Sequence, residues 1–88
     1  MHEYTDMQER ENQDMTLTKA ARKGERLEIV SIQNDDARIQ ALRFGLGAGA
    51  VALCVTKVPG GPIVLKSGRQ EIAIGRKLAD SITVRKCV

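Results

Sequence analysis

Closely spaced turn signals from Thr16 onward are the feature that most constrains this fold. Lys23-Gly24, the four residues 59–62 (Pro-Gly-Gly-Pro) and Ser67-Gly68 all combine residue types that favour turns. The segments between these turns are short and apolar, and several are rich in β-branched residues, which favour strands. This pattern therefore predicts short β-strands joined by brief turns.

The segment 51–58 is the strongest strand candidate, because apolar residues occur on both faces of an alternating run. Ile29 and Ile32 both look buried although they lie three positions apart, which breaks strict alternation and predicts a bulge or a strand end. The expected strands cover residues 27–32, 51–58, 63–66, 71–74 and 82–85, with a weaker first strand or lead-in at 17–21.

One helix is expected between the strands. Asn34 is placed to cap it, and the two aspartates that follow lie in the first turn, where the helix dipole favours negative charge. Ile39, Leu42 and Phe44 are expected to face the core. Gly45 suits the left-handed conformation that ends many helices.

The predicted fold is mainly β: a small barrel of five or six short strands, with one inserted α-helix over 35–44 and a short helical turn over 76–81 before the last strand. A chain of 88 residues buries only about 60% of the surface that its unfolded form exposes. The only aromatic residues are Tyr4 and Phe44, so aliphatic side chains must build the core. Large ligand pockets and base-stacking surfaces are not expected.

Charge is divided between an acidic start and a basic remainder. Residues 1–15 contain five acids and one base, so residues 16–88 keep 13 bases and 6 acids, a net charge of +7 within a total of +3. We interpret 1–15 as a disordered acidic tail and 16–88 as the folded domain. A basic domain favours acidic protein faces, nucleic acids or anionic membranes, and a merely solvated basic surface is the simpler interpretation.

The two cysteines and the hydropathy indicate the cellular compartment. Cys54 lies in an apolar run and Cys87 is penultimate, with neither a secretory signal nor the dense spacing of a disulfide scaffold. The longest uncharged stretch, 44–56, is too short and too rich in glycine for a membrane helix of about 20 residues. We therefore expect a soluble, cytoplasmic protein with no membrane insertion, in which Cys54 is buried on a central strand and Cys87 is free.

Three kinds of chemical site are not expected. Residues 45–50 fit a loose dinucleotide fingerprint, but here the helix precedes the glycines and the strand follows them, the reverse of a phosphate-binding loop. His2 is the only histidine, and the cysteines lack the paired spacing of a metal site, although iron binding as such stays open. The folded region has no histidine to activate a nucleophile. No cofactor, metal site or catalytic residue is predicted, and we do not expect an enzyme.

Several short motifs occur in a fixed order along residues 16–86. They are Leu17, Gly24-Glu25, Ile29 and Ile32; Arg38 and Leu42 before Phe44-Gly45-Leu46 with Gly49; Pro59 with Gly61-Pro62-Ile63; and Ile72-Ala73-Ile74-Gly75-Arg76 with Ala79, Ile82 and Val84. Each motif is weak alone, but the ordered set resembles the FeoA family of bacterial ferrous iron uptake. Gly61 stands where that family commonly has Asp, and this altered turn puts any contact made there in doubt.

The resemblance implies an SH3-like barrel, an FeoA-type domain over 16–88, which assists the ferrous iron permease FeoB from the cytoplasm by contacting its GTP-binding region. It implies no catalytic residue and no cofactor, and we expect a monomer or weak oligomer. A similar domain forms the C-terminal part of iron-dependent repressors, but we do not expect their DNA-binding helices within these 88 residues. The alternative is a small-barrel nucleic-acid-binding module. The domain charge favours it, the lack of aromatic residues on the strands opposes it, and nucleic acid is not expected as the partner.

The expected docking surface is the outward side of the 35–44 helix and the turn after it. Arg38 and Arg43 supply positive charge there, and Leu46, Gly47 and Ala48 follow in the turn. An apolar anchor with a charged rim is a common interface composition. Leu46 has a second interpretation, as a core residue folded under the helix, and the sequence leaves both open.

Overall fold

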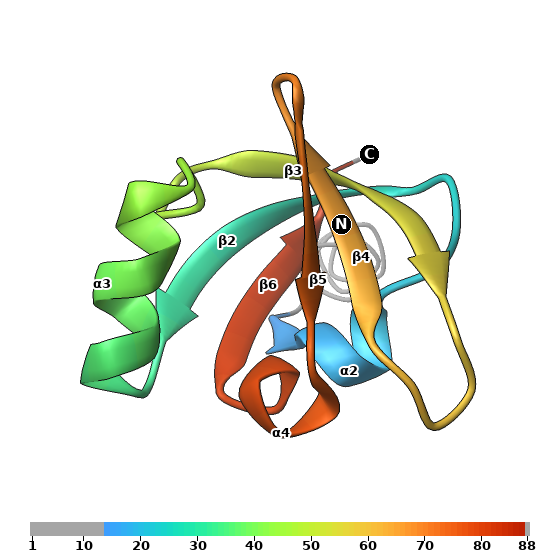
Figure 1. Ribbon diagram of the computed structural model, residues 1–88, viewed down its shortest axis with the longest axis horizontal. Coiled ribbons are helices and arrows are strands. Elements are labelled where there is room, and N and C mark those ends of the chain that lie inside the picture. Colours follow the sequence, from blue (N-terminus) through green and yellow to red (C-terminus); the bar gives the residue numbers. More distant parts are fainter. Residues whose placement is uncertain (1–13, 88) are drawn as a thin grey trace, which may run out of the picture.

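The computed structural model describes residues 14–87 of the chain (Figure 1). Its strands are short, as the closely spaced turn signals predict, and one helix of the described region is longer than four residues. The elements are β1 (Met15–Thr16), α2 (Leu17–Ala20), β2 (Arg26–Ile32), α3 (Asp35–Arg43), β3 (Val51–Lys57), β4 (Ile63–Ser67), β5 (Gln70–Ile74), α4 (Arg76–Ala79) and β6 (Ile82–Lys86).

The six strands of the described region form one antiparallel sheet in the order β1-β6-β2-β3-β4-β5. The sheet curls strongly, so that β5 crosses in front of β6 while α3 stands to one side (Figure 1). This arrangement confirms the mainly β, SH3-like barrel with one inserted helix and a helical turn before the last strand. The two edges of the sheet are β1 and β5.

A bulge in β2 explains how two isoleucines three positions apart reach the same core. The pairing of β2 with β6 shifts register between Ile29 and Ser31. The extra residue turns the following side chains to the other face. Ile29 is therefore 1% exposed and Ile32 is 7% exposed, as predicted.

The core is built from aliphatic side chains, as the composition requires. Cys54 is fully buried among them on β3, which lies between β2 and β4, and Cys87 is exposed. Both placements agree with the prediction. The buried side chains are Leu17, Ala20, Ala21, Leu27, Ile29, Ile32, Ala37, Leu46, Ala52, Cys54, Ile63, Leu65, Ile74, Ala79, Ile82 and Val84.

The start of the domain differs from the prediction. Residues 17–21 were expected as a weak first strand or lead-in, but Leu17–Ala20 form the helical turn α2. The Thr16 hydroxyl caps this turn by accepting a hydrogen bond from the Lys19 N–H. Met15, placed in the disordered tail, pairs with Val84 in the sheet. Residues 1–13, the rest of that predicted tail, lie outside the described residues.

The turn between β3 and β4 is held by Arg76 from α4. Its Nε donates to the Gly61 carbonyl at 2.7 Å and its Nη2 to the Val58 carbonyl at 2.8 Å. A Cβ atom on residue 61 would lie 3.0 Å from the Val58 side chain. This close approach favours glycine at position 61.

Candidate functional site

Local sequence signals define both ends of α3. The Asn34 side-chain oxygen accepts a hydrogen bond from the Ala37 N–H at 3.0 Å, as expected of a cap. At the other end Gly45 takes a φ of +74°, and its N–H donates to the Leu42 carbonyl at 3.2 Å. The N–H of Leu46 donates to the Ala41 carbonyl at 2.7 Å. These paired bonds form a Schellman motif, which turns the chain sharply back under the helix.

The prediction of which side chains of α3 face the core was wrong. Ile39, Leu42 and Phe44 were expected in the core, but they are 52%, 63% and 44% exposed. Ala37 and Ala41 face the sheet instead. Helical spacing explains the error: positions 37 and 41 are one turn apart, whereas 39 and 44 are separated by about 140° at 100° per residue. Ile39 and Leu42 share the opposite face, a signal that was present in the sequence.

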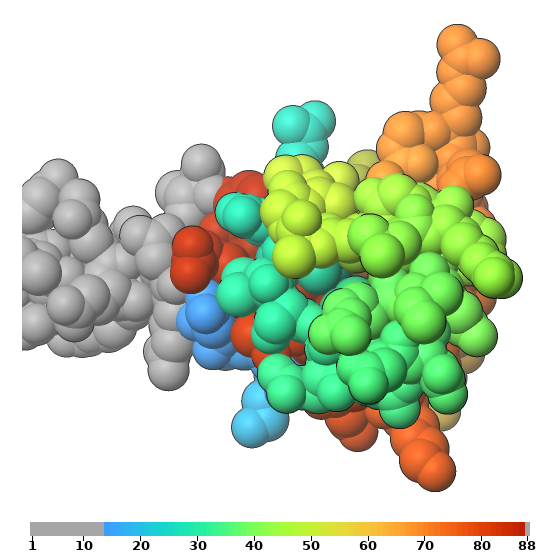
Figure 2. All heavy atoms as spheres, turned by 90° about the vertical axis from the view of Figure 1, so that its left-hand side faces the viewer, coloured from blue at the N-terminus to red at the C-terminus, as the bar shows by residue number. Residues whose placement is uncertain are grey.

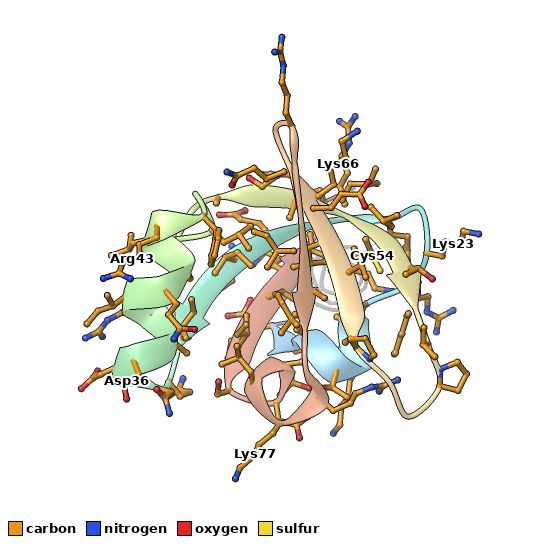
Figure 3. All side chains as sticks on the ribbon, in the orientation of Figure 1. Lys23, Asp36, Arg43, Cys54, Lys66 and Lys77 are labelled. Atoms are coloured by element: carbon orange, nitrogen blue, oxygen red, sulfur yellow. The ribbon has the colours of Figure 1, made fainter. Side chains whose placement is uncertain are left out.

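Of the predicted contact residues, the two arginines lie where they were expected. Arg38 and Arg43 are both exposed on α3. Arg38 forms an exposed ion pair with Asp35, with 2.9 Å between Nη2 and Oδ1, and such pairs contribute little stability. Arg43 has no ion-pair partner among the described residues. Arg43 and Asp36 project from α3 away from the sheet (Figure 3).

Leu46 is 4% exposed, so the structure supports its interpretation as a core residue and corrects the interpretation as an exposed anchor. The Schellman motif explains its burial, because the residue after the left-handed glycine packs against the last turn of the helix. Gly47 and Ala48 stay at the surface beyond it.

The exposed apolar residue beside this turn is Leu42, whereas Leu46 is buried. A Cβ atom on residue 47 would lie 2.6 Å from Leu42 Cδ2, so the Leu42 side chain lies directly over Gly47. We call the region formed by Arg38, Ile39, Leu42, Arg43 and the turn 47–48 the α3 outer surface. Figure 2 shows that α3 and the following turn form one continuous face of the molecule.

An apolar groove lies on the other side of α3, between the helix, the sheet and α4. Its volume is about 210 Å³. It exists because α3 presents small alanine side chains to the sheet and leaves the space between them unfilled. The lining residues are Ile29, Ile32, Ala37, Gln40, Ala41, Phe44, Leu46, Ile72, Ala73, Ile74, Leu78 and Ile82.

Three properties of the described residues concern metal binding, thiol reactivity and membrane insertion. Between residues 14 and 87 no three His, Cys, Asp or Glu side chains gather as a metal site would require. Burial raises the pKa of the Cys54 thiol above its usual 9.0, which keeps it in the unreactive protonated form. No helix in the described part of the chain has the length and apolar character to span a membrane.

The family model of the FeoA domain matches residues 15–86, nearly the whole described region. The chain belongs to the FeoA domain family. Solved structures agree with this membership. A crystal structure of an iron uptake regulatory protein, FeoA, is 31% identical, with 84% of this chain and 97% of that chain covered and a TM-score of 0.73. The FeoA protein from Chlorobium tepidum is 26% identical, with 84% and 71% covered and a TM-score of 0.75.

A more distant likeness shows the fold alone. A manganese-dependent transcriptional repressor is 15% identical to this FeoA-family chain, with a TM-score of 0.73. The aligned region covers 86% of this chain but 43% of the repressor. A comparison with curated protein sequences gave no match.

Proposed function

We propose that this FeoA-family chain is a non-catalytic accessory protein of bacterial ferrous iron uptake. It acts in the cytoplasm by binding the GTP-binding region of a FeoB-type permease. The observation that carries the proposal is the α3 outer surface on a chain of this family. Two aliphatic side chains, Ile39 and Leu42, are more than half exposed there, side by side on one helix face.

The α3 outer surface has the composition of an interface. The exposed pair Ile39 and Leu42 lowers solubility and does not contribute to the core. A role in binding a partner therefore explains these two side chains better than a role in packing does. Arg38 and Arg43 flank the pair and supply positive charge. Arginine is enriched at interfaces because its planar guanidinium group donates several hydrogen bonds and also packs against apolar surface.

The direct test is a calorimetric titration of the full chain against the soluble GTP-binding region of a FeoB permease. Leu42→Ala and Arg43→Glu are each expected to weaken binding about tenfold, because each removes a central interface contact. Lys19→Glu on α2 makes the same charge change away from the α3 outer surface and serves as the matched control. It should leave the affinity nearly unchanged at physiological salt.

Two outcomes would contradict the proposal. One is the absence of binding to the permease region together with normal ferrous iron uptake after deletion of the gene. The other is binding that survives charge reversal at both Arg38 and Arg43, which would exclude this surface. Salt-sensitive binding to RNA or DNA oligomers in place of the permease would favour the nucleic-acid alternative.

A further inference from the structure

The free edge of β5 borders the apolar groove. β5 is the last strand in the sheet order, and β4 is its only strand neighbour among the described residues (Figure 1). It has five residues, contains no proline and carries one charged side chain, that of Glu71. Exposed edges of this length are usually blocked by prolines, bulges or several charges, because they can pair with another chain. β1, at the other edge, has only two residues.

The register identifies which backbone groups are available. Ser67 pairs with Gln70 across a two-residue turn, so these two residues exchange backbone hydrogen bonds. The bonding alternates along the strands, and the backbone N–H and C=O groups of Glu71 and Ala73 therefore point away from β4. No other backbone bond within residues 14–87 involves these two residues.

The groove meets this free edge at Ala73. Ala73 lines it together with Ile72 and Ile74 on one side, and Gln40 and Phe44 of α3 lie on the other. Its volume of about 210 Å³ exceeds the cavities of about 150 Å³ that accept benzene, so one aliphatic side chain fits. A strand added to β5 would direct every second side chain into this space.

The positive charge of the domain favours an acidic segment as the partner of β5. Residues 14–87 contain 13 basic and 7 acidic residues, a net charge of +6, so the same region of a second copy would be repelled. β5 itself has an exposed base just beyond each end, Arg69 in the hairpin turn and Lys77 on α4. Figure 3 shows Lys77 projecting into solvent below α4.

We propose that β5 accepts an extended segment of another protein by β-strand addition, and that this segment has aliphatic side chains at alternate positions and acidic residues at its ends. The added strand bonds to the backbone of Glu71 and Ala73 and places an aliphatic side chain in the groove. This site lies on the opposite side of α3 from the α3 outer surface, so the two proposals can fail separately.

The probe is a short synthetic peptide with glutamates at both ends and alternating isoleucine and threonine between them. It is titrated into the full, ¹⁵N-labelled chain and followed by NMR. Binding should shift the resonances around the groove and slow the exchange of the Glu71 and Ala73 amide protons with solvent. A peptide with terminal lysines in place of the glutamates should bind at least about tenfold more weakly, as expected for several lost charge contacts.

Proline substitution separates strand addition from simple apolar binding. Ala73→Pro removes the free N–H but no bond to β4, because proline is tolerated where an edge N–H faces solvent. We expect about a tenfold loss of peptide affinity. Ala73→Val keeps the N–H and should bind normally. Gln40→Trp, at an exposed helix position, should obstruct the groove and weaken binding without unfolding the domain.

Three results would overturn the proposal. The first is no peptide binding at millimolar concentration, and the second is unchanged affinity in folded Ala73→Pro. The third is protection of the Glu71 and Ala73 amides in the protein alone. Protection that rises with protein concentration would identify a second copy as the occupant, and protection independent of concentration would identify residues 1–13 of the same chain.

Discussion

Replacing Leu46 by Ala tests whether the turn after α3 is part of the core. Leu46 is 4% exposed, so the substitution removes three buried carbon atoms. At about 0.8 kcal/mol for each buried methylene, the transfer contribution is about 2.4 kcal/mol. Leu46 lines the apolar groove, so the vacated space joins an existing opening and no sealed cavity forms. We therefore expect a loss of about 2–3 kcal/mol, in the lower half of the range for buried leucines.

Leu42→Ala is the matched control, because it makes the same chemical change on the same helix. Leu42 is 63% exposed, and alanine has a helix propensity at least as high as that of leucine. Its loss of stability should stay within about 0.5 kcal/mol. The variant that loses little stability should lose permease affinity, and the reverse should hold for the other. Leu42→Ala is expected to weaken the affinity, whereas folded Leu46→Ala is not.

Urea denaturation at equilibrium measures both changes, with the midpoint shifted and the m-value unchanged if only the folded state is affected. The thermal midpoint of Leu46→Ala should fall by about 10–20 °C for a domain of this size. A loss below about 1 kcal/mol for Leu46→Ala, or equal losses in the two variants, would refute the assignment of Leu46 to the core.

Three further predictions concern the thiols and the glycines. A thiol reagent should modify Cys87 rapidly and Cys54 only after unfolding, and equal rates would contradict the burial of β3. Because burial raises the pKa of Cys54 above 9.0, its thiol ionises first in the unfolded state. The stability of the protein should therefore be unaffected by this group below pH 9.0 and decrease above it, and Cys54→Ala should lack this component of the alkaline slope. Gly47→Ala should displace the exposed Leu42 side chain and weaken permease binding at little cost in stability, whereas Gly49→Ala, at a φ of +92°, should cost about 1–2 kcal/mol in urea denaturation.

The sequence by itself determined the features whose causes are local. Asn34 and Gly45 set the two ends of α3, because a side-chain cap and a left-handed glycine act within one turn of the chain. The spacing of Ile29 and Ile32 predicted a bulge or a strand end in β2, and the structure has the bulge. The ordered short motifs also sufficed to identify the FeoA family, because their order and spacing are properties of the chain itself.

Helical spacing in the sequence places Ile39 and Leu42 on one face of α3, but only the tertiary structure decided which face meets the sheet. The tertiary structure also decided which backbone groups stay free. The helix turns its alanines inward because the space beside the sheet is set by strands far away in the chain, and Ile39 and Leu42 are left in solvent as a result. The open edge of β5 likewise depends on the sheet order, which brings β6 beside β2 and leaves β5 at the end. Both features arise from long-range packing, in which one residue's burial depends on partners that no local pattern specifies.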